Sequence, residues 1–361
     1  MVNVMAHVKL DRISKSFKGH TALHDLSIEI ADGQFFVLLG PTGAGKTTTL
    51  RMIAGLEKPD QGSISIDSHD VSDLSAAERD VALVLQQYSL YPRYTVRENL
   101  EFPLKSRIRR MNADEISERV MRAAKVVRVD HLLDRKTDRL SGGEMQRVSI
   151  GRAIVRQPKI FLMDEPLSNL DAKLREALRA ELKDLKTRLG ATFLFVTHDQ
   201  VEAMSMGDRI AVLNEGRIIQ IGTPNEIYNQ PNSVFVAGFV GSPAMNLLKG
   251  SLSNDRVVIG HSAFSVNLSA EQRTRLGNQI GDIIFGFRAE NVSLSTHGIE
   301  ATIHDVENHG VEKVVTLKCD DQFFRVTVAA KTPLHIEQKV HFEIDLAKIH
   351  IFEAASGKRI G

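Results

Sequence analysis

Short apolar segments alternate with longer amphipathic segments along the first 240 residues of the chain. The run Phe35–Leu39 is apolar throughout, as in a strand buried on both faces. Residues 171–189 instead carry leucines three to four positions apart, which predicts a helix with one buried stripe. Strands that alternate with helices indicate an α/β domain with a mostly parallel sheet.

The expected elements of this first region follow from the same two patterns. Strands are expected at 7–13, 25–30, 35–39, 63–67, 81–85, 160–163, 193–196, 209–213 and 217–221. Helices are expected at 46–54, 75–78, 96–101, 112–127, 130–133, 142–156, 171–189 and 199–205.

The strand–helix alternation is interrupted once and then replaced by a different pattern. Residues 88–139 are charged and helix-rich, without convincing strands, and predict an inserted helical subdomain at about 88–157. From about residue 241 the apolar segments become short, often alternating, and separated by Gly, Asn and Asp, as in a β-rich sandwich or barrel. We therefore predict domains at 1–240 and 241–361, with Gly241-Ser242-Pro243 at the boundary. Strands of the second domain are expected at 256–259, 263–268, 283–287, 299–306, 313–319, 322–328 and 339–344.

Composition places the chain among ordinary globular proteins, and its length of 361 residues favours two to three domains. The net charge of +1 gives no electrostatic support for a nucleic-acid partner. The single cysteine, Cys319, fits a reducing compartment and is expected in a strand. The sequence has no apolar run that could span a bilayer and no signal-peptide core, so we expect a cytoplasmic protein.

Residues 40–47 read Gly-Pro-Thr-Gly-Ala-Gly-Lys-Thr, directly after the strand 35–39 and at the start of a helix. This is the G-x-x-x-x-G-K-[ST] phosphate-binding loop in its expected setting. Its glycines let successive N–H groups point at phosphate oxygens, and the helix N-terminus adds partial positive charge. Lys46 would bridge the terminal phosphates and the Thr47 hydroxyl would bind Mg²⁺. The expected nucleotide contacts are Gly40, Pro41, Thr42, Gly43, Ala44, Gly45, Lys46, Thr47 and Thr48.

Two adjacent carboxylates, Asp164 and Glu165, end the apolar run 160–163. Asp164 would hold Mg²⁺ through water, and Glu165 would orient and polarise an attacking water molecule. The alternative is a buried strand with a polar end. The preceding phosphate loop favours the catalytic interpretation.

Four further segments occur in a fixed order around these carboxylates. Leu140-Ser141-Gly142-Gly143 lies upstream, Ser168-Asn169-Leu170-Asp171 and Val196-Thr197-His198-Asp199 lie downstream, and Gln86 follows the strand 81–85. This set resembles the nucleotide-binding subunit of ATP-binding cassette (ABC) transporters. The Leu-Ser-Gly-Gly segment discriminates, because other phosphate-loop classes lack it. Ser141 can also be a helix N-cap, and a helix N-terminus is itself an anion site.

The resemblance implies a head-to-tail homodimer that encloses two ATP molecules with Mg²⁺. One phosphate loop would face Ser141, Gly142 and Gly143 of the other copy. Gln86 would lie near Mg²⁺ and the permease contact, and His198 would touch the γ-phosphate. Phe17 would stack on adenine, although an aromatic residue before a turn is a core residue about as often. Lys46, Gln86, Glu165 and His198 would form the catalytic set, and Thr47, Gln86 and Asp164 the metal set.

The resemblance runs essentially the full length and is most similar to ATPases of bacterial carbohydrate importers, of the maltose and glycerol-3-phosphate type. It implies an OB-fold regulatory domain, two membrane permease subunits, a solute-binding protein, and a place on the inner face of the membrane. Ala289 and Asn291 depart from the family pattern, which weakens inherited regulatory contacts. The segments that carry the resemblance include Tyr88–Pro92, Phe239–Asn246, Gly286–Asn291, Glu307–Glu312 and His350–Phe352.

Several alternatives remain at this stage. An importer for polyamine, ferric ion or another anion would use the same ATPase, and a non-transport ABC ATPase would lack the permeases. The β-rich domain could bind single-stranded nucleic acid, but the chain has no basic and aromatic stripe. The side chains of Tyr88, Leu90, Tyr91 and Val96 either receive a permease helix or pack locally.

Overall fold

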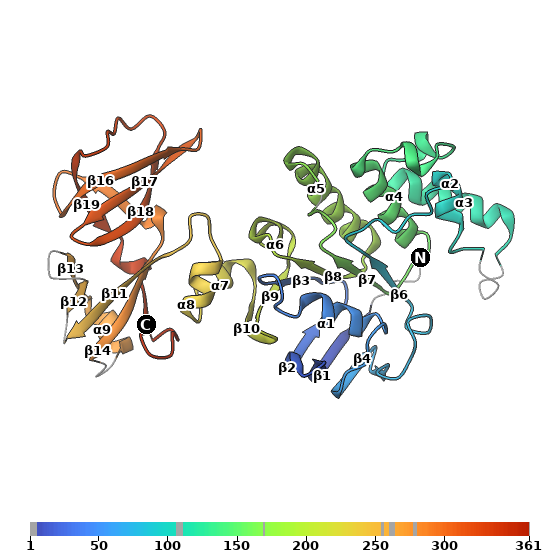
Figure 1. The fold of residues 1–361 in the computed structure, drawn as a ribbon, viewed down its shortest axis with the longest axis horizontal. Coiled ribbons are helices and arrows are strands. Elements are labelled where there is room, and N and C mark those ends of the chain that lie inside the picture. The colour runs from blue at the N-terminus through green and yellow to red at the C-terminus, as the bar shows by residue number, and fades with distance from the viewer. Residues whose placement is uncertain are drawn as a thin grey trace. The chain divides into compact units, whose positions relative to one another are not determined.

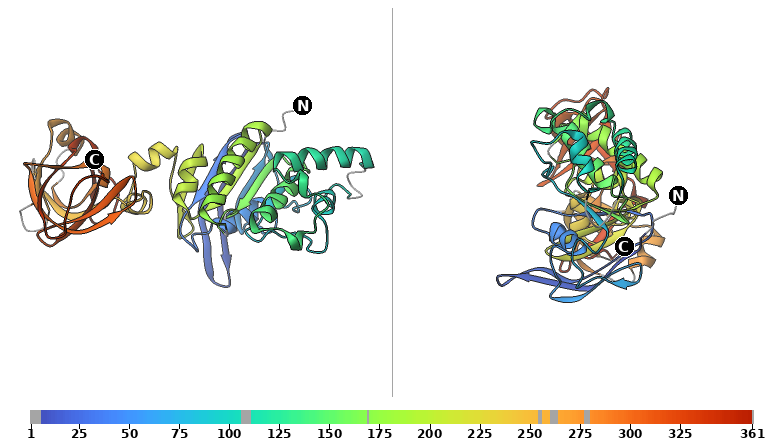
Figure 2. Two further views of the ribbon diagram at one scale, coloured as in Figure 1. Left: turned by 90° about the horizontal axis from the view of Figure 1, so that it is seen from above. Right: turned by 90° about the vertical axis from the view of Figure 1, so that its right-hand side faces the viewer.

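The structure, a computed structural model, describes residues 6–105, 111–168, 170–253, 256–259, 264–276 and 280–360. Asn169 and residue 263, both within predicted segments, lie outside these ranges. The chain divides into two compact units, Met1–Pro224 and Asn225–Gly361, which Figures 1 and 2 draw as ribbons. These units divide between Pro224 and Asn225, and the domain boundary expected at 240/241 remains a prediction.

The first unit is built on a six-stranded sheet in the order β10-β9-β3-β8-β7-β6. The strands β3, β6, β7, β8 and β9 run parallel, and only β10 pairs antiparallel, so the expected mostly parallel sheet is confirmed. The bounds are β3 Phe35–Leu39, β6 Val81–Val84, β7 Ile160–Asp164, β8 Thr192–Thr197, β9 Arg209–Asn214 and β10 Arg217–Gly222.

A second, antiparallel sheet and helix α1 (Lys46–Ile53) cover one face of this sheet (Figure 1). Its strands are β1 Val8–Phe17, β2 His20–Ile30, β4 Gln61–Ile66 and β5 His69–Asp70, in the order β2-β1-β4-β5. Leu50 and Ile53 of α1 join side chains from both sheets in one buried core. Helices α5 (Ala172–Leu189) and α6 (Gln200–Met206) lie on the other side of the parallel sheet (Figure 1).

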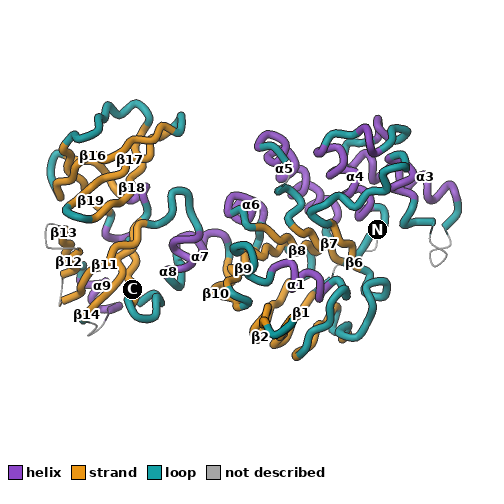
Figure 3. Tube along the Cα trace, in the orientation of Figure 1, coloured by secondary structure: helices purple, strands orange, loops and turns teal. Residues whose placement is uncertain are grey.

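Helices follow β6, as the tube in Figure 3 shows: α2 Val96–Glu101, α3 Ala113–Val126 and α4 Gly142–Ile154. Each begins with a reciprocal capping box, formed by Thr95 with Glu98, Asn112 with Glu115, and Ser141 with Glu144. Such boxes satisfy backbone N–H groups that have no partner inside the helix. The three expected helices are therefore confirmed.

The helix expected at 75–78 is wrong, because these residues form a turn. Glu78 does bond back to Ser75, but the chain then leaves the helical path at Asp80, where φ is +48°. Arg79 is buried between these segments and donates to the carbonyls of Met52 and Ile53 at the end of α1. A local cap thus forms without a helix to continue it.

The second unit contains two five-stranded antiparallel sheets, in the orders β13-β12-β11-β14-β20 and β15-β19-β16-β17-β18. Their inner faces share a core rich in phenylalanine, including Phe264, Phe285 and Phe342. Cys319 is buried on β17, which confirms a strand position. The bounds are β11 Asn246–Ser253, β12 Arg256–Ile259, β13 Phe264–Asn267, β14 Gly281–Phe287, β15 Val292–Ser295, β16 Ile299–Asn308, β17 Glu312–Cys319, β18 Gln322–Ala329, β19 Lys339–Ile344 and β20 His350–Glu353, with helices α7 Pro224–Asn229, α8 Val234–Phe239 and α9 Ala270–Leu276.

Buried polar residues bind the segments of the second unit together. The Arg288 guanidinium donates to the carbonyls of Val240 and Tyr228 and lies 3.9 Å over the Tyr228 ring. Asn246 donates to the Arg325 carbonyl and accepts from its N–H, each over 2.8 Å.

Burial lowers the pKa of His350 on β20 to about 4. Among the described residues, no helix has both the length and the apolar character needed to cross a bilayer.

Candidate functional site

The carboxyl ends of β3, β7 and β8 meet at one edge of the parallel sheet. Leu39 pairs with Thr197, and Asp164 pairs with Val196, so three chain segments leave the sheet at the same level. These segments are the phosphate loop, the carboxylates Asp164 and Glu165, and the segment with His198. Open α/β sheets bind ligands at this edge.

Glycines let the loop after β3 turn sharply into α1. Gly45 is the N-cap of α1 with φ +101°, and a Cβ there would lie 2.8 Å from the Ala22 carbonyl oxygen. At Gly40 a Cβ would overlap the Leu213 carbonyl oxygen. Any other residue at these two positions would therefore distort the loop. Gly43 also has positive φ, Ala44 is buried and donates to the Pro41 carbonyl, Thr42 is exposed, and Thr48 is half-buried.

Lys46 is buried at the start of α1, with 5% of the residue exposed. Its Nζ donates to the carbonyls of Gly40 over 2.9 Å and Pro41 over 3.0 Å, and lies 3.6 Å from Glu165 Oε1. Burial lowers the pKa of Lys46, and the nearby Glu165 opposes this shift. The ammonium therefore lies inside the loop that is predicted to hold phosphates.

Thr47 and Asp164 bring two oxygen ligands together. Thr47 Oγ1 donates to Asp164 Oδ1 over 3.1 Å. Asp164 is 8% exposed, and burial raises the pKa of its carboxyl group. The described residues contain no group of three or more His, Cys, Asp or Glu side chains that could hold a metal. A hydroxyl beside one carboxylate fits Mg²⁺, which takes its remaining ligands from water and phosphate.

Glu165 lies between Lys46 and His198. Its Oε2 is 2.9 Å from His198 Nδ1, and its N–H donates to the Val196 carbonyl over 3.0 Å. Its φ of +45° is in the left-handed region, which turns the side chain out of the strand direction. A carboxylate held by an imidazole and an ammonium suits the activation of water.

Gln86 reaches the same site from the end of β6. Its Nε2 donates to Ser168 Oγ over 3.1 Å, and Ser168 Oγ donates to the Glu165 carbonyl over 2.9 Å. The structure therefore brings together six of the residues proposed for the site: Gln86, Lys46, Thr47, Asp164, Glu165 and His198.

Phe17 and the Ser141–Gly143 segment lie on other elements. Phe17 is 40% exposed at the end of β1, and the next strand, β2, carries Ala22 and Leu23 beside Gly45. Ser141 caps α4, which packs on α2, α3 and β6, whereas α1 packs on β2, β7 and β8. A Cβ on Gly143 would overlap the Leu174 side chain of α5. Glu144 completes the capping box of α4.

The residues predicted either to receive a permease helix or to pack locally differ in exposure. Val96 is fully buried and packs locally. Tyr91 and Tyr94 are exposed and lie with Phe102 in one aromatic cluster, with ring centroids 4.4 to 6.4 Å apart. Arg152 lies 5.6 Å over the Tyr91 ring. Tyr88 and Leu90 are half-buried.

Sequence reasoning missed two charged residues beside the site, Arg175 and Glu202, which lie behind His198. It also missed the buried Arg79, which holds the other end of α1. Burial raises the pKa of Glu202. Arg175 and Glu202 each lie in a predicted helix, but their contact with each other joins two helices that are distant in sequence.

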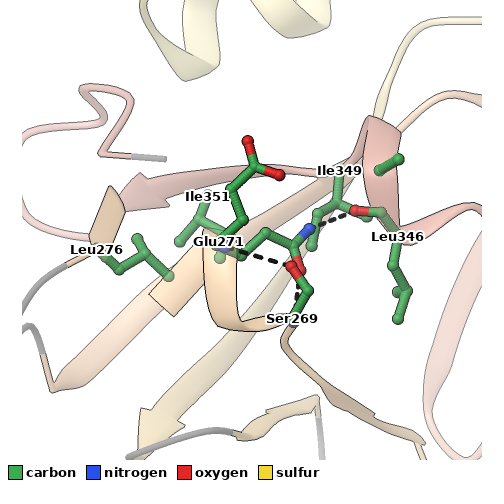
Figure 4. Close-up of a pocket in the computed structure, with 8 residues that line it drawn as sticks. Ser269, Glu271, Leu276, Leu346, Ile349 and Ile351 are labelled. Atoms are coloured by element: carbon green, nitrogen blue, oxygen red, sulfur yellow. Dashed lines mark hydrogen bonds between the residues drawn. The ribbon is translucent and has the colours of Figure 1, made fainter. Parts of the chain in front are cut away.

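A cavity of about 340 Å³ lies in the second unit between α9 and β20 (Figure 4). Isoleucine and leucine make up half of its lining residues, including Leu276, Leu346 and Ile351. Both ends of the Gln272 amide are bonded, to the Ser269 N–H and the Leu346 carbonyl. None of the predicted site residues lines this cavity. The Gln272 amide holds α9 in place.

Two family models and several full-length relatives match this chain. A model of the ABC transporter family matches residues 23–168, and a model of the MalK OB fold domain matches residues 241–292. The trehalose/maltose import ATP-binding protein MalK of Thermococcus litoralis is 45% identical over 99% of this chain and 100% of its own. The oligosaccharides import ATP-binding protein MsmX of Bacillus subtilis is 42% identical over the same shares.

Solved structures give the same result for the first unit. The dimeric ATP-binding cassette MJ0796, bound to ADP and Pi, has a TM-score of 0.55 and 35% identity. It covers 60% of this chain and 98% of its own length. The full-length relatives and the two family models show that the chain belongs to the ABC-transporter ATP-binding proteins. Members of this group join a phosphate-loop ATPase domain to a MalK-type OB-fold domain.

Proposed function

We propose that this chain is the ATP-hydrolysing subunit of a carbohydrate importer. The observation that carries the proposal is the cluster at the ends of β3, β7 and β8, where Lys46 and His198 both contact Glu165. The full-length relatives named for trehalose, maltose and oligosaccharide import support the carbohydrate class.

In this function the phosphate loop binds ATP, and Lys46 neutralises charge on its terminal phosphates. Glu165 accepts a proton from the attacking water, while His198 orients Glu165 and contacts the γ-phosphate. Thr47 and Asp164 would hold Mg²⁺, with Gln86 beside them, and the ion would supply further neutralisation of phosphate charge. Phe17, exposed at the end of β1, would stack on the adenine.

A second copy of the chain would complete the site. Ser141, Gly142 and Gly143 lie at the N-terminus of α4, which packs on different elements from α1. A head-to-tail homodimer would place this N-terminus of one copy against ATP on the loop of the other. The dimeric state of the cassette MJ0796 supports this arrangement.

Transport requires partners that reach the membrane. Tyr91, Tyr94 and Phe102 form an exposed aromatic cluster that suits a helix from a permease subunit. Two permeases and a solute-binding protein would complete the importer, and the chain would lie on the inner face of the membrane. The domain division at 240/241 would then separate the ATPase from a regulatory domain.

The test of the ATPase is Glu165→Gln. We expect hydrolysis to fall by about 10²- to 10⁴-fold while ATP still binds, because only proton transfer is removed. Light scattering with ATP and Mg²⁺ should then show a stable dimer. Glu176→Gln, an exposed position on α5, should leave hydrolysis unchanged. Wild-type turnover in Glu165→Gln would overturn the role of Glu165.

The test of the solute class uses cells that lack this chain. We expect them to lose uptake of at least one labelled solute from a panel of maltose, trehalose and glycerol 3-phosphate. The tagged chain, purified in mild detergent, should carry two membrane subunits. Loss of polyamine or ferric ion uptake with intact sugar uptake would contradict the carbohydrate assignment, and co-purification with ribosomes or DNA would contradict transport.

A further inference from the structure

One guanidinium joins the segment before α5 to the segment that carries His198. Arg175 Nη2 donates to the Leu170 carbonyl over 3.1 Å, and Nη1 donates to Asp199 Oδ2 over 3.4 Å. Leu170 lies just before α5, and Asp199 directly follows His198. Arg175 therefore fixes one segment against the other next to Glu165.

The carboxylates that Arg175 contacts are themselves held in place. Asp199 Oδ1 accepts from the N–H groups of Val201 and Glu202 at the start of α6, which leaves Oδ2 for Arg175. Glu202 is 3% exposed, accepts from Thr197 Oγ1 and lies 3.9 Å from Arg175 Nε. The guanidinium thus meets fixed acceptors, which makes its position well defined.

These contacts form a closed ring that begins and ends at Glu165. The Glu165 carbonyl accepts from Ser168, and the Leu170 N–H donates to the carbonyl of Leu167, the residue before Ser168. Arg175 carries the ring from Leu170 to Asp199. His198, next to Asp199, returns to the Glu165 carboxylate over 2.9 Å.

We propose that Arg175 is a positioning residue for hydrolysis, which holds the His198 imidazole against Glu165 by tying Asp199 to the Leu170 carbonyl. The proposal rests on the proposed ATPase function. The hydrogen bonds and ion pairs of the Arg175 side chain within the described ranges go to Leu170, Asp199 and Glu202. Arg175 thus acts through His198, in the way that a third group orients a catalytic base.

Kinetics of the full chain test this role. For Arg175→Gln we expect kcat for ATP to fall by about 10- to 100-fold, because small misplacements of a catalytic group are costly. The KM for ATP should stay within about twofold, since the phosphate loop is untouched. Arg175→Lys keeps the charge but cannot span two acceptors, so it should recover only part of kcat. Arg188→Gln, at an exposed pair with Asp184 on the same helix, should leave kcat unchanged.

The imidazole itself provides a readout that does not need hydrolysis. In the chain labelled with ¹⁵N-histidine, the His198 Nδ1 signal is assigned by its loss in His198→Gln. We expect this signal to move toward that of a solvent-exposed histidine in Arg175→Gln and to stay in place in Arg188→Gln. If Arg175→Gln fails to fold, Arg175→Lys carries both measurements.

Two results would overturn the proposal. The first is a kcat within twofold of wild type in the folded Arg175 variants. The second is a lower kcat with an unmoved His198 signal, which would mean that Arg175 acts elsewhere. If wild type itself fails to hydrolyse ATP, the proposed function fails, while the His198 signal still decides whether Arg175 positions the imidazole.

Discussion

Buried polar side chains do different work in the two units of this protein. In the first unit the buried Lys46 and Asp164 lie with the half-buried Glu165 at one sheet edge. Lys46 Nζ is 3.6 Å from Glu165 Oε1, and Asp164 Oδ1 is 3.1 Å from the Thr47 hydroxyl. In the second unit Arg288 and Asn246 bond to main-chain groups of distant segments. The bonds of Arg288 and Asn246 join segments that are far apart in the chain and so fix the fold, whereas the side chains of the first unit meet at the sheet edge where a ligand can replace one of their partners.

The two units also differ in their expected response to acid. Burial raises the pKa of Asp164, so the folded first unit binds a proton more tightly than the unfolded chain does. Burial lowers the pKa of His350 to about 4, so the folded second unit binds its proton more weakly. Acid therefore favours folding through Asp164 and opposes it through His350.

Among the substitutions that test this comparison, the largest effect is expected for Lys46→Ala, which removes the cation from the cluster. ATP affinity and hydrolysis should fall, with kcat/KM lower by about 10²- to 10³-fold, because a preorganised donor to the phosphates is lost. Equilibrium binding of a fluorescent ATP analogue and steady-state ATPase assays measure this. The control is Lys58→Ala, because the Lys58 ammonium is exposed and pairs with the exposed Asp73. Unchanged ATP affinity would show that the loop does not bind phosphate as described.

A smaller effect is expected for Asp164→Asn. Hydrolysis should fall by about 10²-fold as the metal-binding carboxylate is lost. The unfolding temperature at pH 7 should rise, because a carboxylate with a raised pKa destabilises the fold at every pH above that pKa. Calorimetry at pH 7 measures the rise. A lower unfolding temperature would indicate that the Thr47 contact outweighs the cost of burial.

The smallest effect is expected for His350→Phe. Wild type should lose about 2 kcal/mol of the second unit's stability from pH 7 to pH 4.5, because the unfolded imidazole gains a proton near pH 6.5 and the folded one near pH 4. His350→Phe should remove this loss, while the exposed His297→Gln should retain it. Hydrogen exchange of β14 and β20 peptides measures the difference. Equal acid sensitivity in both variants would contradict the account of His350.

The sequence predicted the parts of the site that depend on local pattern. The phosphate loop is contiguous, and Asp164, Glu165 and His198 each follow a strand of a parallel sheet, so their meeting at one edge follows from the strand pattern alone. The N-cap position of Ser141 at the start of α4 also follows from local sequence. The β-rich second unit was recognised by short alternating segments, although β11, β15 and β20 were not assigned as strands.

What the sequence did not predict depends on contacts between distant residues. Arg175 meets Asp199, 24 positions along the chain, and nothing in the helix 171–189 marks it among the other charges. Arg79 occupies a space set by the end of α1, and the residues just before it form a turn where a helix was expected at 75–78. The burial of Val96 depends on how the helices after β6 pack. In each case tertiary packing decides what the local pattern leaves open.

Lys46 keeps two main-chain carbonyls, of Gly40 and Pro41, within hydrogen-bond distance. A phosphate that replaces either carbonyl as acceptor gains only the difference in free energy between the two bonds. Departure of the product returns the ammonium to the same carbonyls. Such internal competition limits how tightly spent nucleotide is retained, which favours rapid turnover over high affinity in a site that must empty once in every cycle.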